Sequence, residues 1–195
     1  MDLNIINTVI ISEVPESTLL LKKALAQSNY NIIFDSHSLK DLLQTADLVS
    51  PELIIVILQE AHLDMFTHLK IITEQFSLPV VIFSDDDRDD VIEHAIASDV
   101  SAYVMDGMDE HRIIPILKMA QARFKQQASM QQEIESLRTD LADRKQIDKA
   151  KGIIMSQRQC SEDEAYKLLR TSAMNQNIRL AELAKNIIST AALLA

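Results

Sequence analysis

The chain has 195 residues, a formal net charge of −10 and 47% hydrophobic residues, which is enough apolar material for the core of one large or two small domains. Its only glycines, Gly107 and Gly152, exclude a glycine-rich nucleotide-binding loop, and its single cysteine, Cys160, excludes an internal disulfide. No apolar run approaches the roughly 20 residues of a membrane span, and no basic segment precedes the apolar start, so we expect a cytoplasmic protein without membrane contact.

Short apolar runs alternate with helix-period segments in the first part of the chain. Buried strands are predicted at Thr8–Ile11, Leu53–Leu58 and Val80–Phe83, with weaker ones at Asn31–Phe34 and Ala102–Met105. Helices are predicted at Ser17–Ala26, Leu39–Leu48, Met65–Phe76 and Asp89–Ala97. Strands that are apolar on both faces and alternate with helices indicate a flavodoxin-like α/β domain over residues 1–120, with a parallel five-stranded sheet between helices.

The acidic run Asp85–Asp90 leads into the last of these helices and includes its first two residues. Such a run could hold a cation, but carboxylates at a helix start are already favoured by the helix dipole, so we expect solvated capping groups. The five histidines are dispersed, and no Ser, His and Asp set stands in a catalytic context. We therefore expect no metal, no cofactor and no enzymatic activity.

From Arg112 onward no strand pattern returns. Met130, Ile134, Leu137 and Leu141 recur at spacings of four, three and four among charged residues, which is the pattern of a coiled-coil seam. We predict a long helix whose residues 121–143 form a coiled-coil linker and join two copies as a homodimer. A solvated connecting helix is the alternative, because the seam covers barely two heptads.

Residues 144–195 divide into three helical segments. Ser161–Glu164 form a capping box that begins the second. The faces predicted to be buried are Ile147, Ala150 and Ile154; Ala165, Leu168, Leu169 and Ser172; and Leu180, Leu183, Ala184, Ile187 and Ile188. Each helix is marginal alone, so an all-α three-helix bundle is expected. From Ala142 the chain holds nine Lys and Arg against six Asp and Glu, whereas the first 141 residues hold ten against 23, so the output half is mildly basic.

The order of strand, acidic turn and helix resembles the receiver domain of response regulators. In that family an acid pair after the first strand holds Mg²⁺, an aspartate ending the third accepts the phosphoryl group, and a Ser or Thr and a Lys follow the fourth and fifth. The matching positions here are Ser12 and Glu13, Ile57, Ser84 and Asp106. Isoleucine offers no oxygen lone pair, so the resemblance implies a degenerate phosphorylation site in a domain kept for binding and dimerisation.

Three runs in the tail resemble the ANTAR domain, the RNA-binding module of bacterial transcription antiterminators. They are AKGIIM at Ala150–Met155, SEDEAYKLLR at Ser161–Arg170 and SAMNQN at Ser172–Asn177. The whole chain is similar to the NasT group of nitrate-assimilation regulators. The resemblance implies that dimers bind paired hairpins in a leader RNA and prevent termination, under the control of a nitrate- or nitrite-sensing protein similar to NasS rather than a kinase.

RNA loops present bases and phosphates, which call for aromatic or guanidinium stacking surfaces beside lysines. The predicted RNA-binding residues are Arg144, Lys149, Lys151, Gly152, Arg158, Tyr166, Lys167, Arg170 and Arg179. Tyr166 would stack on a base, and the missing side chain of Gly152 would permit close approach of another helix or a backbone. For Met174 and Asn177 we expect packing roles. A DNA-binding response regulator and a protein-interaction adaptor are the alternatives, although the last helices lack a basic recognition helix.

Overall fold

The computed structural model describes residues 5–39, 41–42, 50–106 and 108–193. The chain forms two compact units, residues 1–128 and 129–195. The division between them falls inside one long helix, within the segment that the sequence predicts as the linker. Each unit is described by itself.

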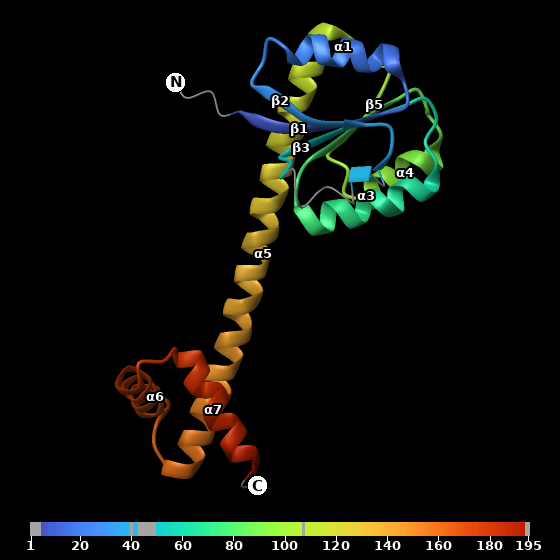
Figure 1. Cartoon of the computed structure of the whole chain (residues 1–195). Coiled ribbons are helices and arrows are strands. Elements are labelled where there is room, and N and C mark those ends of the chain that lie inside the picture. The colour runs from blue at the N-terminus through green and yellow to red at the C-terminus, as the bar shows by residue number, and fades with distance from the viewer. Residues whose placement is uncertain (1–4, 40, 43–49, 107, 194–195) are drawn as a thin grey trace. The chain divides into compact units, whose positions relative to one another are not determined.

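The first unit is built on a five-stranded parallel sheet with the order β2-β1-β3-β4-β5 (Figure 1). The strands are β1 (Ile6–Ser12), β2 (Tyr30–Ser36), β3 (Leu53–Leu58), β4 (Val80–Ser84) and β5 (Ala102–Met105). Central strands β3 and β4 are buried along their whole length. A strand buried on both faces must be apolar throughout, and this is why the runs of Ile, Val and Leu were readable in the sequence.

Helices cover both faces of this sheet. They are α1 (Pro15–Leu25), α3 (Leu63–Phe76), α4 (Asp89–Ala97) and the first part of α5 (Glu110–Arg158). Alternate strand residues face opposite ways, so Ile10 and Ile55 pack with α1 and α5, whereas Val9 and Ile54 pack with α3 and α4. The predicted receiver-like α/β fold is confirmed.

The predicted helix Leu39–Leu48 lies mostly outside the described residues. The other predicted elements of this unit are all present, and the shifts are at their ends. For example, α1 begins at Pro15, two residues before the predicted start, because the fixed φ of proline suits the first turn of a helix.

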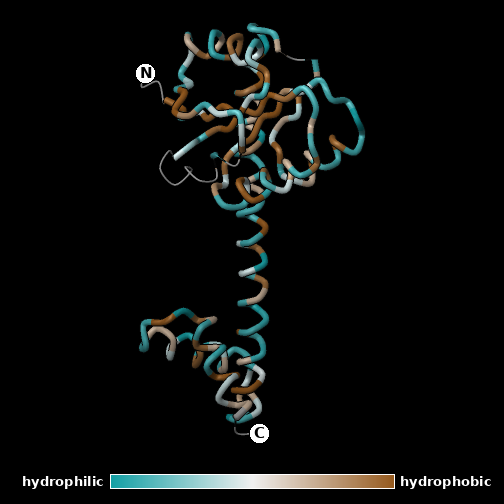
Figure 2. Tube along the Cα trace, turned by 45° about the vertical axis from the view of Figure 1, so that its right-hand side comes forward, coloured by the Kyte–Doolittle hydropathy of each residue, from teal (hydrophilic) through white to brown (hydrophobic). Residues whose placement is uncertain are grey.

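Helix α5 runs for 49 residues. Its first turns pack on the sheet, and residues 125–142 are exposed throughout. The four seam residues Met130, Ile134, Leu137 and Leu141 are between 44% and 61% exposed. In Figure 2 the strands are largely brown, whereas this stretch of α5 alternates between hydrophilic and hydrophobic colours. Among the described residues, no helix is both long and apolar enough to cross a membrane.

The second unit packs the end of α5 with α6 (Glu162–Gln176) and α7 (Leu180–Leu193). Its core contains Ala150, Leu169, Ala173, Leu183 and Ala184, with Ile147, Ile154 and other partly buried residues around them. The capping box is present: the Ser161 side chain accepts from the backbone N–H of Glu164, and the Glu164 side chain accepts from the backbone N–H of Ser161 at 2.9 Å. The predicted helical output unit is confirmed.

The buried face of α6 differs from the predicted one. The buried residues are Ala165, Leu169 and Ala173, whereas Leu168 is 42% exposed and Ser172 is exposed as well. The buried residues of α6 are four positions apart, and Leu169 and Ala173 pack with residues of α5 and α7 in the core of the unit. The prediction that Leu168 and Ser172 are buried was therefore wrong.

Candidate nucleic-acid interface

Both units hold residues that the sequence singled out. In the first unit, the strand register brings Ser12 level with Ile57, and Leu58 level with Ser84, at the carboxyl edge of the sheet. The Ile57 side chain is 2% exposed and belongs to the apolar core beneath α1 and α5. Where a phosphoacceptor would need an exposed carboxylate, this fold has a hydrophobic side chain that water does not reach.

The other residues at the phosphorylation-site positions are Ser12, Glu13 and Asp106. The Ser12 hydroxyl accepts from Thr18 Oγ1 at 2.6 Å and from the backbone N–H of Val14 at 3.1 Å, so it fixes the start of α1. Glu13 and Asp106 are exposed, and Asp106 adopts a left-handed backbone with φ of 48°. Among the residues that the structure describes, no group of three or more His, Cys, Asp or Glu is placed to hold a metal ion.

Asp86 is the residue of this edge whose role the sequence did not reveal. It is buried, and its carboxylate accepts from Arg88 Nη2 at 2.8 Å, from Arg88 Nε at 3.0 Å and from the backbone N–H of Ala61 at 3.0 Å. Tyr103 Oη donates to the Asp86 carbonyl oxygen at 2.9 Å. The expectation of solvated capping groups was wrong for this residue, because the loops after β3 and β4 close over it.

These contacts set the charge state of Asp86. The hydrogen bonds from Arg88, and then the one from the Ala61 N–H, hold the pKa of the Asp86 carboxyl well below its usual range. The same pairing raises the pKa of Arg88. The network joins the β3–α3 and β4–α4 loops by polar contacts.

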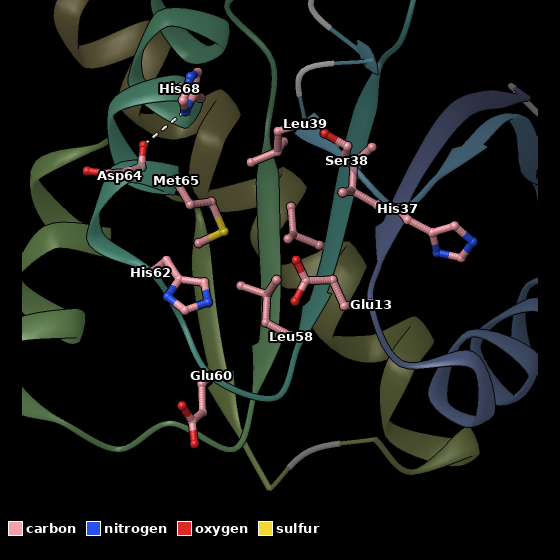
Figure 3. A pocket seen from close by; sticks show the side chains of 12 residues that line it. Glu13, His37, Ser38, Leu39, Leu58, Glu60, His62, Asp64, Met65 and His68 are labelled. Carbon is pink, nitrogen blue, oxygen red and sulfur yellow. Dashed lines mark hydrogen bonds between the residues drawn. The ribbon is translucent and has the colours of Figure 1, made fainter.

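A cavity of about 400 Å³ lies beside this edge, between the ends of β1 and β3 and the start of α3 (Figure 3). Figure 3 shows Glu13 and His62 on opposite sides of Leu58, while His37 turns aside; its Nδ1 lies 2.7 Å from the Ser12 carbonyl oxygen. The lining of the cavity contains carboxylates and imidazoles but neither lysine nor arginine.

In the second unit, α6 presents the predicted stacking surface. Tyr166 is 41% exposed, and Lys167 and Arg170 are exposed beside it. Tyr166 and Arg170 are four residues apart and therefore neighbours on one side of the helix. Arg179, in the short connection to α7, is exposed as well. This part of the unit can offer an aromatic plane, a guanidinium plane and further positive charge.

The cations of α5 do not form a single group. Lys149 and Lys151 lie about 160° apart around the helix axis, so they cannot contact the same phosphate. Lys149, Arg144 and Arg158 are exposed. The Lys151 side chain is only 15% exposed, and its Nζ lies 2.7 Å from Asp148 Oδ1 and 2.6 Å from Glu162 Oε1. These hydrogen bonds raise the pKa of Lys151 and tie the end of α5 to the start of α6, so its ammonium group already has two carboxylate partners.

Gly152 faces open space. Outside its own helix, a Cβ placed on it would meet no atom of the described residues within 4 Å, so none of the described helices approaches it, and the position stays open to another helix or a backbone. Lys145 and Lys149 precede it by seven and three residues, so the three lie on one side of α5. Lys145 is exposed and was not among the predicted contacts, although its spacing from Lys149 could have revealed it.

The expected packing roles of Met174 and Asn177 are also corrected. Met174 is 70% exposed, so it packs against nothing that would bury it. Asn177 is the C-cap of α6 and adopts the left-handed conformation with φ of 53°, and its backbone N–H donates to the carbonyl oxygens of Ala173 and Met174. Asparagine tolerates this conformation better than most residues, so its role is to end the helix.

Comparisons with known proteins agree with this division. Residues 135–188 match the ANTAR domain. Over 170 residues, 87% of this chain and 83% of the relative, the sequence is 22% identical to the transcriptional regulatory protein PdtaR of Mycobacterium tuberculosis. Over 84 residues, 43% of this chain, it is 34% identical to the nitrate regulatory protein of Klebsiella oxytoca, covering 20% of that protein. The fold is similar to a signal receiver domain of a modulated diguanylate cyclase from Desulfovibrio desulfuricans, with a TM-score of 0.56, 13% identity and coverage of 63% of this chain and 98% of that one.

Proposed function

We propose, for a chain that carries a receiver-like domain followed by an ANTAR domain, that it is a transcription regulator which binds hairpins in a nascent leader RNA and prevents termination. The observation that carries this proposal is the exposed side of α6, where Tyr166 and Arg170 are neighbours and Lys167 lies beside them. Unpaired RNA bases stack on such planes, and nearby cations contact the phosphates. The proposed place of action is the cytoplasm, and no catalytic activity is assigned.

Recognition of duplex DNA is less well supported. A helix that enters the major groove needs several side chains that reach base edges. Helix α7 contains one Lys or Arg, Lys185, whose Nζ lies 3.5 Å from Asp143 Oδ1, and Arg179 stands just before the helix begins. A protein-interaction adaptor, in turn, would need neither the exposed cations nor the tyrosine.

We further propose that the chain acts as a homodimer formed through α5. Met130, Ile134, Leu137 and Leu141 form an exposed apolar stripe in coiled-coil spacing, and a second copy of the helix would cover it. Two ANTAR domains on one transcript would bind two hairpins with an avidity about 10²–10⁴ above that of a single site. Dimerisation would then itself be the switch between weak and tight RNA binding.

Control of this switch is assigned to a protein partner rather than a kinase. The buried Ile57 and the acidic Asp106 leave the receiver-like domain without a phosphoacceptor and without the lysine of that family. The similarity to a nitrate regulatory protein supports nitrate or nitrite assimilation genes as the target and a nitrate-sensing protein similar to NasS as the partner.

The experiment compares binding of the full chain to RNA and to DNA across a salt series. The RNA probe is a two-hairpin pool with fixed stems and randomised loop bases, and the DNA probe is a duplex of equal length. We expect selective RNA binding, and a salt slope that falls by about one unit in Lys167→Ala and in Lys149→Ala, since both lysines are exposed. Lys185→Ala is the matched control, since that lysine pairs with Asp143, and it should leave the slope unchanged. Failure to bind the RNA pool at low salt, or equal affinity for duplex DNA, would contradict the proposal.

A further inference from the structure

Met174 extends the exposed side of α6 by another turn. Tyr166, Arg170 and Met174 follow one another at intervals of four residues, which places them in one row along the helix. Tyr166 is 41% and Met174 70% exposed, and Arg170 between them is exposed too. The buried residues of α6 form the adjacent row, Ala165, Leu169 and Ala173, so this row stays on the exposed side of the helix.

The surroundings of the row favour a polyanion. From Ala165 to Ala181 the sequence contains no Asp or Glu, whereas Lys167, Arg170 and Arg179 supply three positive charges. The acidic residues of α6 are confined to its first turn, Glu162 to Glu164, where they are favoured by the helix dipole. A phosphate backbone that followed the row along α6 would therefore pass cations of this helix and no carboxylate of it beyond that turn.

The spacing of the row matches the thickness of a nucleobase. Four residues of α-helix rise by about 6 Å. Bases stack at about 3.4 Å, so one base held between two side chains needs a gap of about 7 Å. Tyrosine and arginine offer planar faces, and the methionine thioether packs well against aromatic rings. Small changes of side-chain rotamer would make each gap one base wide.

We propose that Tyr166, Arg170 and Met174 form a base-reading ridge with two slots, each of which takes one unpaired base of a hairpin loop. Met174 closes the second slot and is a binding residue rather than a packing residue. This inference rests on the proposed function and deepens it. The ridge contacts the bases, whereas the cations around it contact the phosphates.

Leu168 provides a matched control on the same helix. It is a large apolar residue with 42% exposure, close to the value for Tyr166, but it lies about 160° away from Arg170 around the axis. Replacing it by alanine removes similar exposed apolar area without touching the ridge. Stability effects of the variants can be separated from binding by the helical circular dichroism signal of the full chain.

The test measures binding of the full chain to two RNAs with identical stems. One is the two-hairpin pool with randomised loop bases, and the other has abasic loops that keep every phosphate. We expect the wild type to bind the abasic RNA about tenfold or more weakly, with the same salt slope. Tyr166→Ala and Met174→Ala should weaken binding to the intact loops, by about tenfold and about threefold, and leave binding to the abasic loops unchanged. Met174→Leu should retain most of the affinity, and Leu168→Ala should match the wild type on both RNAs.

The outcomes separate this inference from the proposed function. If the wild type binds intact and abasic loops equally, RNA binding stands and the ridge is refuted. Equal losses of Met174→Ala on both RNAs, or a loss in Leu168→Ala as large as that in Met174→Ala, refute it too. If the wild type binds neither RNA, the proposed function fails and the ridge fails with it.

Discussion

Gly152→Ala should raise the stability of the second unit and lower its affinity for RNA. Gly152 lies inside α5, where glycine costs a helix about 1 kcal/mol relative to alanine. The added methyl group meets no described atom within 4 Å, so no clash offsets this gain. We therefore expect a gain of about 0.5–1 kcal/mol, which raises Tm by up to about 4–8 °C for a unit of this size.

The binding effect has the opposite sign if RNA approaches Gly152. Lys145 and Lys149 lie on the same side of α5, so a phosphate held between them would pass over the glycine. A methyl group there would displace the backbone from at least one charged hydrogen bond, which is worth about 1.5–3 kcal/mol, or about tenfold or more in affinity.

The assay pairs thermal unfolding, followed by circular dichroism at the helical minimum, with anisotropy of the labelled two-hairpin RNA pool. Thr139→Ala is the matched control: it is an exposed position of α5 that also gains helix propensity, so it should raise stability without changing affinity. A Gly152→Ala variant that is more stable and binds RNA as the wild type does would refute the contact. A variant that is less stable would contradict the conclusion that a methyl group at position 152 causes no clash.

Three further predictions test the rest of the molecule. Ile57→Asp should acquire no phosphate from acetyl phosphate on a phosphate-affinity gel, and should lose about 3 kcal/mol or more of stability because the new carboxylate is buried; phosphate labelling of this variant at the substituted position would refute the reasoning. The folded pKa of Asp86 lies below its ordinary 3.8, so its contribution to stability is complete above that pH and is lost as the pH falls further. Asp86→Asn should therefore have a lower free energy of unfolding at pH 7, and this free energy should depend less on pH below pH 4 when measured by urea titration. A pH dependence equal to that of the wild type would contradict the role of Arg88. Leu137→Lys should be monomeric by light scattering and lose about 10²-fold in affinity for two hairpins but not for one; a dimer that persists would exclude the α5 seam.

Local patterns were sufficient for much of this structure. The strands β3 and β5 have the predicted bounds, and the capping box at Ser161 was read correctly. Strand burial, helix period and capping depend on residues close together in the chain, which is why the sequence alone carried them. The ANTAR resemblance likewise rested on short runs, and residues 135–188 match that domain.

Tertiary neighbours decided the rest. Leu168 was predicted to be buried and Ala173 was not, but it is Ala173 that packs in the core with Ala150 of α5 and Leu183 of α7, whereas Leu168 is exposed. The sequence does not reveal that Lys151 is paired, because its partner Glu162 lies eleven residues later in the chain. Asp86 belongs to an acidic run, yet the loop after β3 buries it and supplies the Ala61 N–H. Charge and hydropathy are properties of single residues and can be read from the sequence. Pairing and burial depend on which helices, strands and loops pack together, and residue spacing along the chain does not determine that.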